Sequence, residues 1–169
     1  MIRPILKYGD APLHEPAQPV DALTSDVDRL VDDLIETMYA APGIGLAATQ
    51  VGVPLRIFVV DLSVGRDASG LVVLINPTIL ERDGTQLEEE GCLSLPGFNA
   101  TVVRPARLVV RGLDREGQER QHEASGLLAR AFQHEIDHLD GTLFVDRLRG
   151  LKRDLIVRKI RKLTRAGKW

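Results

Sequence analysis

The sequence of 169 residues contains one cysteine, few aromatic residues and no long apolar run. A single cysteine excludes an intramolecular disulfide, and an aromatic content of 4% leaves aliphatic side chains to fill the core. No segment approaches the roughly 20 apolar residues of a membrane-spanning helix, and the first residues lack the apolar core of a signal peptide. With 44% hydrophobic residues, we expect one domain over residues 1–169, located in the reducing cytoplasm and without a membrane partner.

Charge is distributed unevenly along the chain, although the net charge is only −2. Residues 147–168 hold ten basic residues and one acid, Asp154, so this segment carries +9 and the remainder carries −11. Apolar residues at helical spacing predict a basic helix at about 151–165. A basic helix on an acidic body favours a polyanionic partner. The alternative is that the basic residues form a solvated face whose positive charge balances the negative charge of the body.

Local patterns predict a mixture of helices and strands. Apolar residues at helical spacing predict one helix that Pro42 and Gly43 end, and a second helix from about Ser125 to Leu139. Strands are predicted at 56–62, at 71–75 with Asn76-Pro77 closing it, and as a pair at 101–113 and 118–123. Because strands and helices do not alternate regularly, the pattern favours an α+β fold over a doubly wound sheet.

The most specific pattern is H-E-x-x-H, formed by residues 134–138 in the second predicted helix. His134 and His138 lie four residues apart and project from one helix face, so their ring nitrogens can converge on one cation. Glu135 can reach a water beside that ion without ligating it. Apolar residues form two stripes on this helix, which predicts packing on more than one side, where idle histidines would be costly.

A catalytic metal needs a third protein ligand, and Cys92 is the candidate. It lies in the segment EGCLSLPG, where Gly91 before it and Pro96-Gly97 after it indicate a bend. A thiolate ligand would explain a lone cysteine in a reducing compartment. The alternative is a buried structural thiol, which is common for a free cysteine.

A third segment, GIGLAATQ at 43–50, offers two glycines and the amide of Gln50. Glycines allow the backbone to approach a ligand closely, and an amide donor can stabilise an oxyanion. The glycine spacing differs from that of dinucleotide-binding loops, and no strand precedes it. Taken alone, the segment is more typical of an ordinary turn.

Taken together, GIGLAATQ at 43–50, EGCLS at 90–94 and QHEIDH at 133–138 resemble the peptide deformylases. These metal enzymes remove the N-formyl group from new bacterial and organellar proteins, and the resemblance covers about residues 43–141. It implies a central HExxH helix surrounded by short antiparallel β-sheets, with helices near both ends. The implied substrates are N-formyl-methionyl nascent peptides, and the products are formate and a free amine.

The resemblance also implies a role for individual residues. The implied metal ligands are Cys92, His134 and His138. The implied catalytic groups are Glu135 as general acid and base, with Gln50 and the backbone N–H of Leu93 on the formyl oxygen. The implied substrate-binding residues are Ile44, Gly45, Leu127 and Ala131.

The resemblance implies one divalent metal ion, Fe²⁺ as the usual native metal, with Zn²⁺, Ni²⁺ or Co²⁺ able to replace it. It also implies that the basic C-terminal helix docks on the ribosome surface. Two positions depart from the usual family pattern. Asn99 stands where a basic residue is frequent, which changes one substrate contact. Arg130 stands where an aliphatic pocket residue is frequent, and we expect its stem to pack while its guanidinium reaches solvent.

Two other interpretations remain open from the residues alone. An endopeptidase of the HExxH type would use a carboxylate such as Asp146 as the third ligand, and Cys92 would then be dispensable. A non-catalytic module that binds the ribosome or nucleic acid through the basic tail would keep its binding without a metal.

Overall fold

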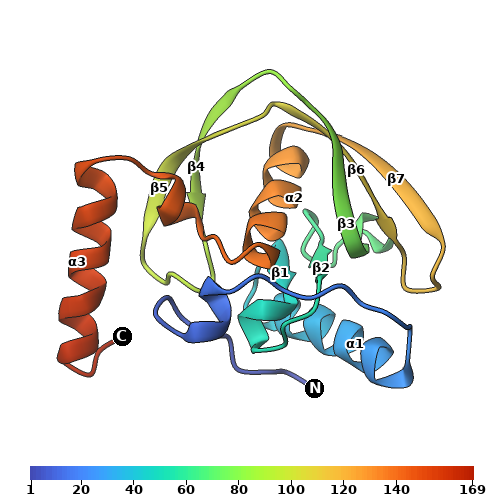
Figure 1. Cartoon of the computed structure of the whole chain (residues 1–169), viewed down its shortest axis with the longest axis horizontal. Helices are drawn as coiled ribbons and strands as arrows, with labels where there is room; N and C mark the ends of the chain where they lie inside the picture. Colours follow the sequence, from blue (N-terminus) through green and yellow to red (C-terminus); the bar gives the residue numbers. More distant parts are fainter.

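The computed structural model describes all 169 residues, and its strands form two separate antiparallel sheets (Figure 1). The helices are α1 (Ser25–Ala40), α2 (Gly126–Leu139) and α3 (Leu151–Arg165). The larger sheet has the order β1-β2-β3-β6-β7, formed by Gly45–Ala47, Ile57–Val60, Val72–Asp83, Arg107–Leu113 and Glu119–Ser125. The smaller sheet pairs β4 (Gln86–Gly91) with β5 (Asn99–Arg104). None of the three helices combines the length and apolar character that a membrane crossing requires.

Helix α1 begins where the Thr24 side chain accepts a hydrogen bond from the N–H of Val27. Asp26 and Asp28 in the first turn complement the helix dipole. Its apolar stripe packs on β2, in a cluster that includes the fully buried side chains of Leu34 and Met38. Burial of an aliphatic side chain of this size contributes about 1.5–3 kcal/mol, so packing holds the helix against the sheet.

The prediction that Asn76-Pro77 closes a strand at residue 75 is wrong. Strand β3 continues through this pair to Asp83 and pairs with β6 on both sides of it. The register shifts between Ile75 and Thr78, and Asn76 has a φ of 53°. This bulge leaves the proline without a ladder position that needs an N–H donor.

The prediction of one strand at 101–113 is also wrong. Pro105 separates β5 from β6, and the two strands belong to different sheets. The predicted pairing with the strand at 118–123 is present, because β6 and β7 form a hairpin across residues 114–117. Strand β4 was not predicted, since four of its six residues are Gln or Glu and give no apolar alternation.

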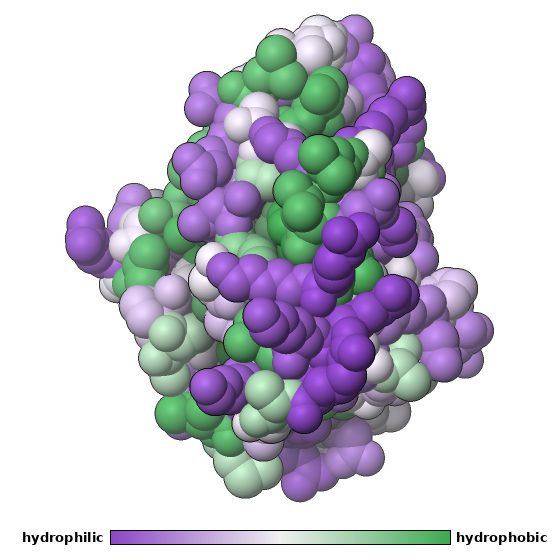
Figure 2. Space-filling model, turned by 90° about the vertical axis from the view of Figure 1, so that its left-hand side faces the viewer, coloured by the Kyte–Doolittle hydropathy of each residue, from purple (hydrophilic) through white to green (hydrophobic).

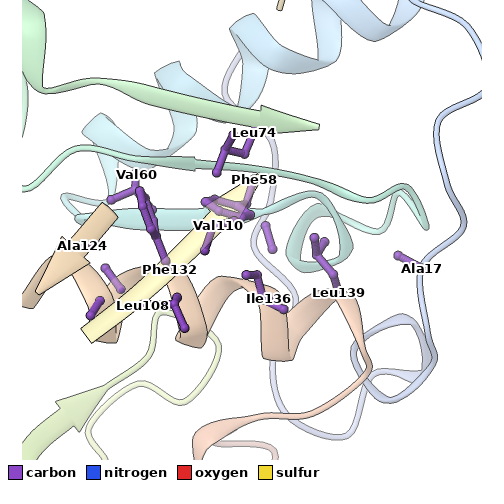
Figure 3. Packing of buried hydrophobic residues seen from close by; sticks show 13 residues of the cluster. Ala17, Phe58, Val60, Leu74, Leu108, Val110, Ala124, Phe132, Ile136 and Leu139 are labelled. Atoms are coloured by element: carbon purple, nitrogen blue, oxygen red, sulfur yellow. The ribbon is translucent and has the colours of Figure 1, made fainter. Parts of the chain in front are cut away.

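Helix α2 lies at the centre of the molecule, with the larger sheet on one side and the β4–β5 pair on the other (Figure 1). Phe132, Ile136 and Leu139 of α2 face the strands that carry Phe58 and Val110 (Figure 3). This apolar contact fixes the rotation of α2 about its axis. The histidines of the helix therefore point away from the large sheet, toward the chain that follows β4.

Helix α3 stands at the edge of the molecule, beside β5 (Figure 1). Ile160 is buried in a core cluster with the 3₁₀ turn Phe144–Arg147 (η4), and Ile156 and Val157 pack against the same cluster. The Trp169 indole N–H donates to the carbonyl of Tyr8 at 2.8 Å, which ties the end of the chain to the body. Leu151 and Leu155 remain exposed, so only part of the predicted apolar stripe is covered.

Candidate metal centre and active site

Three potential metal ligands meet beside α2. The Nε2 atoms of His134 and His138 lie 3.2 Å apart, as expected for residues one helical turn apart on one face. The Cys92 sulfur lies 3.3 Å from Nε2 of His138. The ligand atoms of the three side chains all lie within 4.8 Å of one another. Segments more than 40 residues apart in the sequence thus supply a single cluster of one thiol and two imidazoles.

Cys92 owes its position to the end of β4. Gly91 is the last residue of that strand and pairs with Asn99 of β5. The chain then turns, and the Leu95 N–H donates to the carbonyl of Cys92 at 3.0 Å. The Ser94 N–H points at the cysteine sulfur at 3.4 Å. The bend predicted around this cysteine is therefore what directs its sulfur toward α2.

A carboxylate beside the cluster favours a positive charge among its three side chains. The Glu90 carboxylate is hydrogen-bonded to Nδ1 of His134. Although burial opposes the shift, hydrogen bonds from His134 and Arg104 hold the pKa of Glu90 well below its ordinary value. Burial also works against a charged His134, but its contacts with Cys92 and Glu90 outweigh burial and raise its pKa. Burial lowers the pKa of His138, which keeps this imidazole neutral and able to act as a ligand.

The donor set fits a divalent transition metal. Thiolate and imidazole ligands suit Fe²⁺, Zn²⁺, Ni²⁺ and Co²⁺ and are poor ligands for Mg²⁺ or Ca²⁺. Three protein ligands leave a position for water or substrate, as catalytic metal sites require. A carboxylate on the far nitrogen of a ligating histidine, as Glu90 is on His134, fixes the ring and strengthens its donor nitrogen.

Glu135 lies next to this cluster without joining it. Its Oε1 is 4.0 Å from Nε2 of His134, and its Oε2 is buried without any hydrogen-bond partner. Burial raises the pKa of Glu135 to about 7, the range in which a carboxyl group can both accept and return a proton at neutral pH. Gly45 of β1 makes room for it, because a Cβ at that residue would lie 2.6 Å from Oε1.

Two residues that can donate hydrogen bonds, Gln50 and Leu93, line the same space. Gln50 lies in a 3₁₀ turn, Ala48–Val51 (η2), and is only 1% exposed. Its Oε1 accepts from the Ala47 N–H and its Nε2 donates to Ser94 Oγ, each at 3.0 Å, which fixes the amide orientation. The same Nε2 lies 3.8 Å from the Cys92 sulfur. The Leu93 N–H donates no backbone hydrogen bond within the chain.

A cleft of about 410 Å³ opens in front of these groups. Nine of the ten residues singled out from the sequence line it: Ile44, Gly45, Gln50, Cys92, Leu93, Leu127, Ala131, His134 and Glu135. His138, the tenth, is fully buried beside Cys92 and His134. The structure therefore brings the three sequence motifs to one place.

Comparison with known proteins identifies the family. The sequence profile of the family described as polypeptide deformylase matches residues 2–154. The chain belongs to this family. A peptide deformylase from Acidobacterium capsulatum is 52% identical over 169 residues, covering all of this chain and 99% of its own length. One from Alkalilimnicola ehrlichii is 55% identical over 164 residues, covering 97% of this chain and 92% of its own length.

Solved deformylase structures share the fold. The peptide deformylase of Legionella pneumophila superimposes with a TM-score of 0.91 at 43% identity, covering 99% of this chain and 98% of that one. The deformylase of Ehrlichia chaffeensis in complex with actinonin gives a TM-score of 0.87 at 39% identity, covering 95% and 96%. The resemblance, the α+β fold and the enzymatic class predicted from the sequence are confirmed.

The activity follows from family membership. The chain is a metal-dependent hydrolase that removes the N-formyl group from the terminal methionine of newly made proteins. The two other interpretations lose their support. Asp146, the alternative third ligand, caps η4 by accepting from the Leu143 N–H at 2.9 Å and is absent from the metal-ligand cluster.

The prediction for Arg130 is wrong. Its side chain is buried, and the guanidinium does not reach solvent. It donates instead to Glu90 at 2.7 Å and to the carbonyl of Val102 at 3.0 Å. The guanidinium can be buried because Glu90 and the Val102 carbonyl accept the hydrogen bonds that water would otherwise accept.

Sequence reasoning did not find the residues that support the ligands. Glu90 was part of a recognised motif, but nothing in the sequence indicated its bond to His134. Arg104 forms ion pairs with Glu90 and Asp137, each at 2.5 Å. Its signal was present in the alternation of β5, where Ala100, Val102 and Arg104 share the buried face.

Proposed function

We propose that Cys92, His134 and His138 hold the one divalent metal ion of this deformylase. The observation that carries the proposal is the convergence of their ligand atoms to within 4.8 Å, beside a buried carboxylate. Fe²⁺ is the native metal that we propose from the family, and Zn²⁺, Ni²⁺ or Co²⁺ would be held by the same donors. When bound, the metal polarises water and the formyl group.

The cleft supports a binding mode for the substrate. The backbone at Ile44 and Gly45 offers an extended edge along the cleft, because β1 pairs with β2 on its other side only. Leu127 and Ala131, on the first two turns of α2, line the same cleft as Cys92 and His134. We assign these four residues to the formyl-methionyl peptide: the backbone to its main chain and the α2 side chains to the methionine side chain.

The catalytic groups divide the reaction between them. The Gln50 amide and the Leu93 N–H donate to the formyl oxygen and stabilise the negative charge that develops on it. Glu135 accepts a proton from the attacking water, whose oxygen forms a bond to the formyl carbon. The same carboxyl group then gives its proton to the nitrogen as the C–N bond breaks. The products are formate and the free amino group of methionine.

The assay that tests this function measures formate release from a formyl-Met peptide by the metal-loaded protein. The matched reaction offers the same peptide without the formyl group and follows cleavage of its peptide bonds. We expect formate from the first peptide, no cleavage of the second, and loss of formate release after chelation. Peptide-bond cleavage with no formate would contradict the assignment.

We also propose where the enzyme works. Residues 1–169 act as a single catalytic domain whose basic helix α3 docks on the ribosome surface, in the cytoplasm where formylated chains emerge. The outer face of α3 supports docking: Figure 2 shows hydrophilic side chains gathered on the side of the molecule where α3 lies. A shallow surface there is lined by four basic residues with Leu155 and Ala166, namely Arg158, Lys159, Lys162 and Arg165.

A further inference from the structure

The metal ligands come from two parts of the fold that share little apolar contact. His134 and His138 belong to α2, whose apolar face packs against the large sheet. Cys92 follows β4, and the apolar residues of the β4–β5 pair, Ala100 and Val102, pack in a different cluster with η4. Polar side chains therefore bridge the two parts, and the position of the cysteine relative to the histidines depends on them.

Arg130 is the residue of α2 that hydrogen-bonds to both β4 and β5, beside the single pairs His134–Glu90 and Asp137–Arg104. Its Nη1 donates to Glu90 Oε2 at 2.7 Å and its Nη2 to the carbonyl of Val102 at 3.0 Å. Its Nε faces Gln86 Oε1 at 3.2 Å. A single guanidinium thus contacts both ends of β4 and the middle of β5. Because the fork is planar and rigid, these contacts fix both distance and orientation.

Glu90 connects Arg130 to the metal centre. The carboxylate that accepts from Arg130 is also bonded to Nδ1 of His134, and Cys92 follows two residues later. Arg104 holds the same carboxylate from β5, at 3.1 Å to Oε2 and 2.5 Å to Oε1. The Arg104–Glu90 pair lies within the β4–β5 sheet, and Arg104 reaches α2 through its ion pair with Asp137 at 2.5 Å. Arg130 adds hydrogen bonds from α2 to both strands of that sheet, four residues before His134.

We infer that Arg130 is a positioning residue for the metal centre: it docks the strand that leads to Cys92 against the helix that carries His134 and His138. The inference rests on the proposed set of metal ligands. Loss of Arg130 leaves Glu90 paired with Arg104 and His134, so its charge keeps partners and the chain is expected to fold. The loss should instead loosen the spacing between thiolate and imidazoles.

The test uses Co²⁺ as the probe, because its absorption reports both the thiolate bond and the coordination geometry. Arg130→Met keeps the length of the stem and removes every hydrogen bond of the fork. We expect it to bind Co²⁺ roughly 10–100-fold more weakly in competition with a chelator, with shifted bands at saturation. Arg130→Lys keeps the charge and one donor nitrogen but not the planar fork, and we expect it to recover part of the affinity.

The matched control is Arg56→Met. Arg56 also holds α2, through the carbonyl of Leu139 and the carboxylate of Asp140, each at 3.0 Å, but it does not touch Glu90. A merely structural role for Arg130 predicts lower stability in both variants with unchanged Co²⁺ spectra. We expect Arg56→Met to keep the wild-type spectrum and affinity.

The outcomes separate the inference from the proposal beneath it. If the wild-type protein shows no thiolate-to-cobalt band, the proposed ligand set fails. If the wild type shows the band and Arg130→Met matches it in affinity and spectrum, only the role of Arg130 is overturned. Should Arg130→Met fail to fold, Arg130→Lys decides: a wild-type spectrum and affinity in that variant would overturn the inference.

Discussion

Gly45 lies directly against the carboxylate of Glu135, at a distance that leaves no room for a side chain. A Cβ at residue 45 would lie 2.6 Å from Oε1 and 3.1 Å from Cδ of Glu135. Gly45 has no positive φ, so an alanine there meets no backbone strain. The glycine is therefore required by the close approach of β1 to Glu135 of α2.

We predict that Gly45→Ala lowers turnover while the protein keeps its metal, because the methyl group displaces the Glu135 carboxylate. Glu135→Gln provides the reference for complete loss of the proton acceptor, roughly 10²–10⁴-fold in kcat. We expect Gly45→Ala to fall between wild type and this reference in formate release. The control is Gly43→Ala, whose Cβ would meet the end of the flexible Leu93 side chain at 2.8 Å. Equal turnover in Gly45→Ala and wild type would contradict the prediction.

A second prediction concerns the cysteine. Cys92→Ser should release metal during desalting, because a hydroxyl group ionises far less readily than a thiol. Metal analysis of the purified protein measures this directly. Ser94→Ala is the matched control, since it removes the Gln50 partner two residues away and leaves the sulfur in place. Full metal content in Cys92→Ser would show that the thiol serves packing alone.

A third prediction concerns a buried carboxylate away from the active site. Asp61 is fully buried at the end of β2 and accepts from Tyr39 Oη at 2.6 Å, Ser63 Oγ at 2.6 Å and the Gly65 N–H at 3.0 Å. Burial opposes its ionisation, but the hydrogen bonds from Ser63 and Tyr39 outweigh burial and lower the pKa of Asp61 below 3.8. Asp61→Asn loses an acceptor for the Gly65 N–H and should destabilise the protein by about 1–3 kcal/mol at pH 7.

The pH dependence of this effect has a defined sign. A carboxyl group whose folded pKa is lowered stabilises the protein above its unfolded pKa and loses that contribution as pH falls through the folded value. The difference in unfolding free energy between wild type and Asp61→Asn should therefore shrink below about pH 4. Denaturant unfolding at several pH values measures it. Asp67→Asn, at an exposed turn, is the control: an asparagine oxygen can accept the same hydrogen bonds from Ser69, so we expect a smaller loss of stability than in Asp61→Asn. A difference that is constant down to pH 2.5 would contradict the assignment.

The parts of the molecule that could be predicted from the sequence are those with a local signal. The HExxH spacing is a property of one helix, so the convergence of His134 and His138 followed from the helical repeat alone. That this helix lies beside Cys92 and Gln50 could be predicted only because three motifs in order resemble one family. No local pattern encodes contacts between residues 42 or more positions apart.

The parts that could not be predicted depend on partners far away in the sequence. An arginine on a helix ordinarily indicates a solvated face. Arg130 is buried because Glu90 and the Val102 carbonyl accept hydrogen bonds from its guanidinium. The sequence of strand β4 is rich in acidic residues and by itself predicts a loop, because its strand conformation depends on pairing with β5. At Pro77, the proline that normally ends a strand is accommodated by a bulge that depends on β6.

The last prediction concerns α3. Arg158, Lys162 and Arg165 lie at helical spacing on its exposed side and form no salt bridge within the chain, whereas Ile160 holds the opposite side to the body. Charge reversal of these three residues to Glu therefore inverts three of the four basic side chains of this surface and leaves the packing of Ile160 intact. Truncation before Leu151 would instead remove Ile160 and uncover the core cluster in which it packs.

We expect the triple variant to lose co-sedimentation with ribosomes while it releases formate from short peptides at the wild-type rate. Binding by the wild type should fall on the order of tenfold between 50 and 200 mM salt, because phosphate contacts release counterions. The control reverses three exposed arginines of the body, Arg29, Arg66 and Arg82. If both triple variants bind as the wild type does, independent of salt, α3 serves only to cover the core cluster around Ile160. If both lose binding equally, the attraction is a property of net charge and not of this helix.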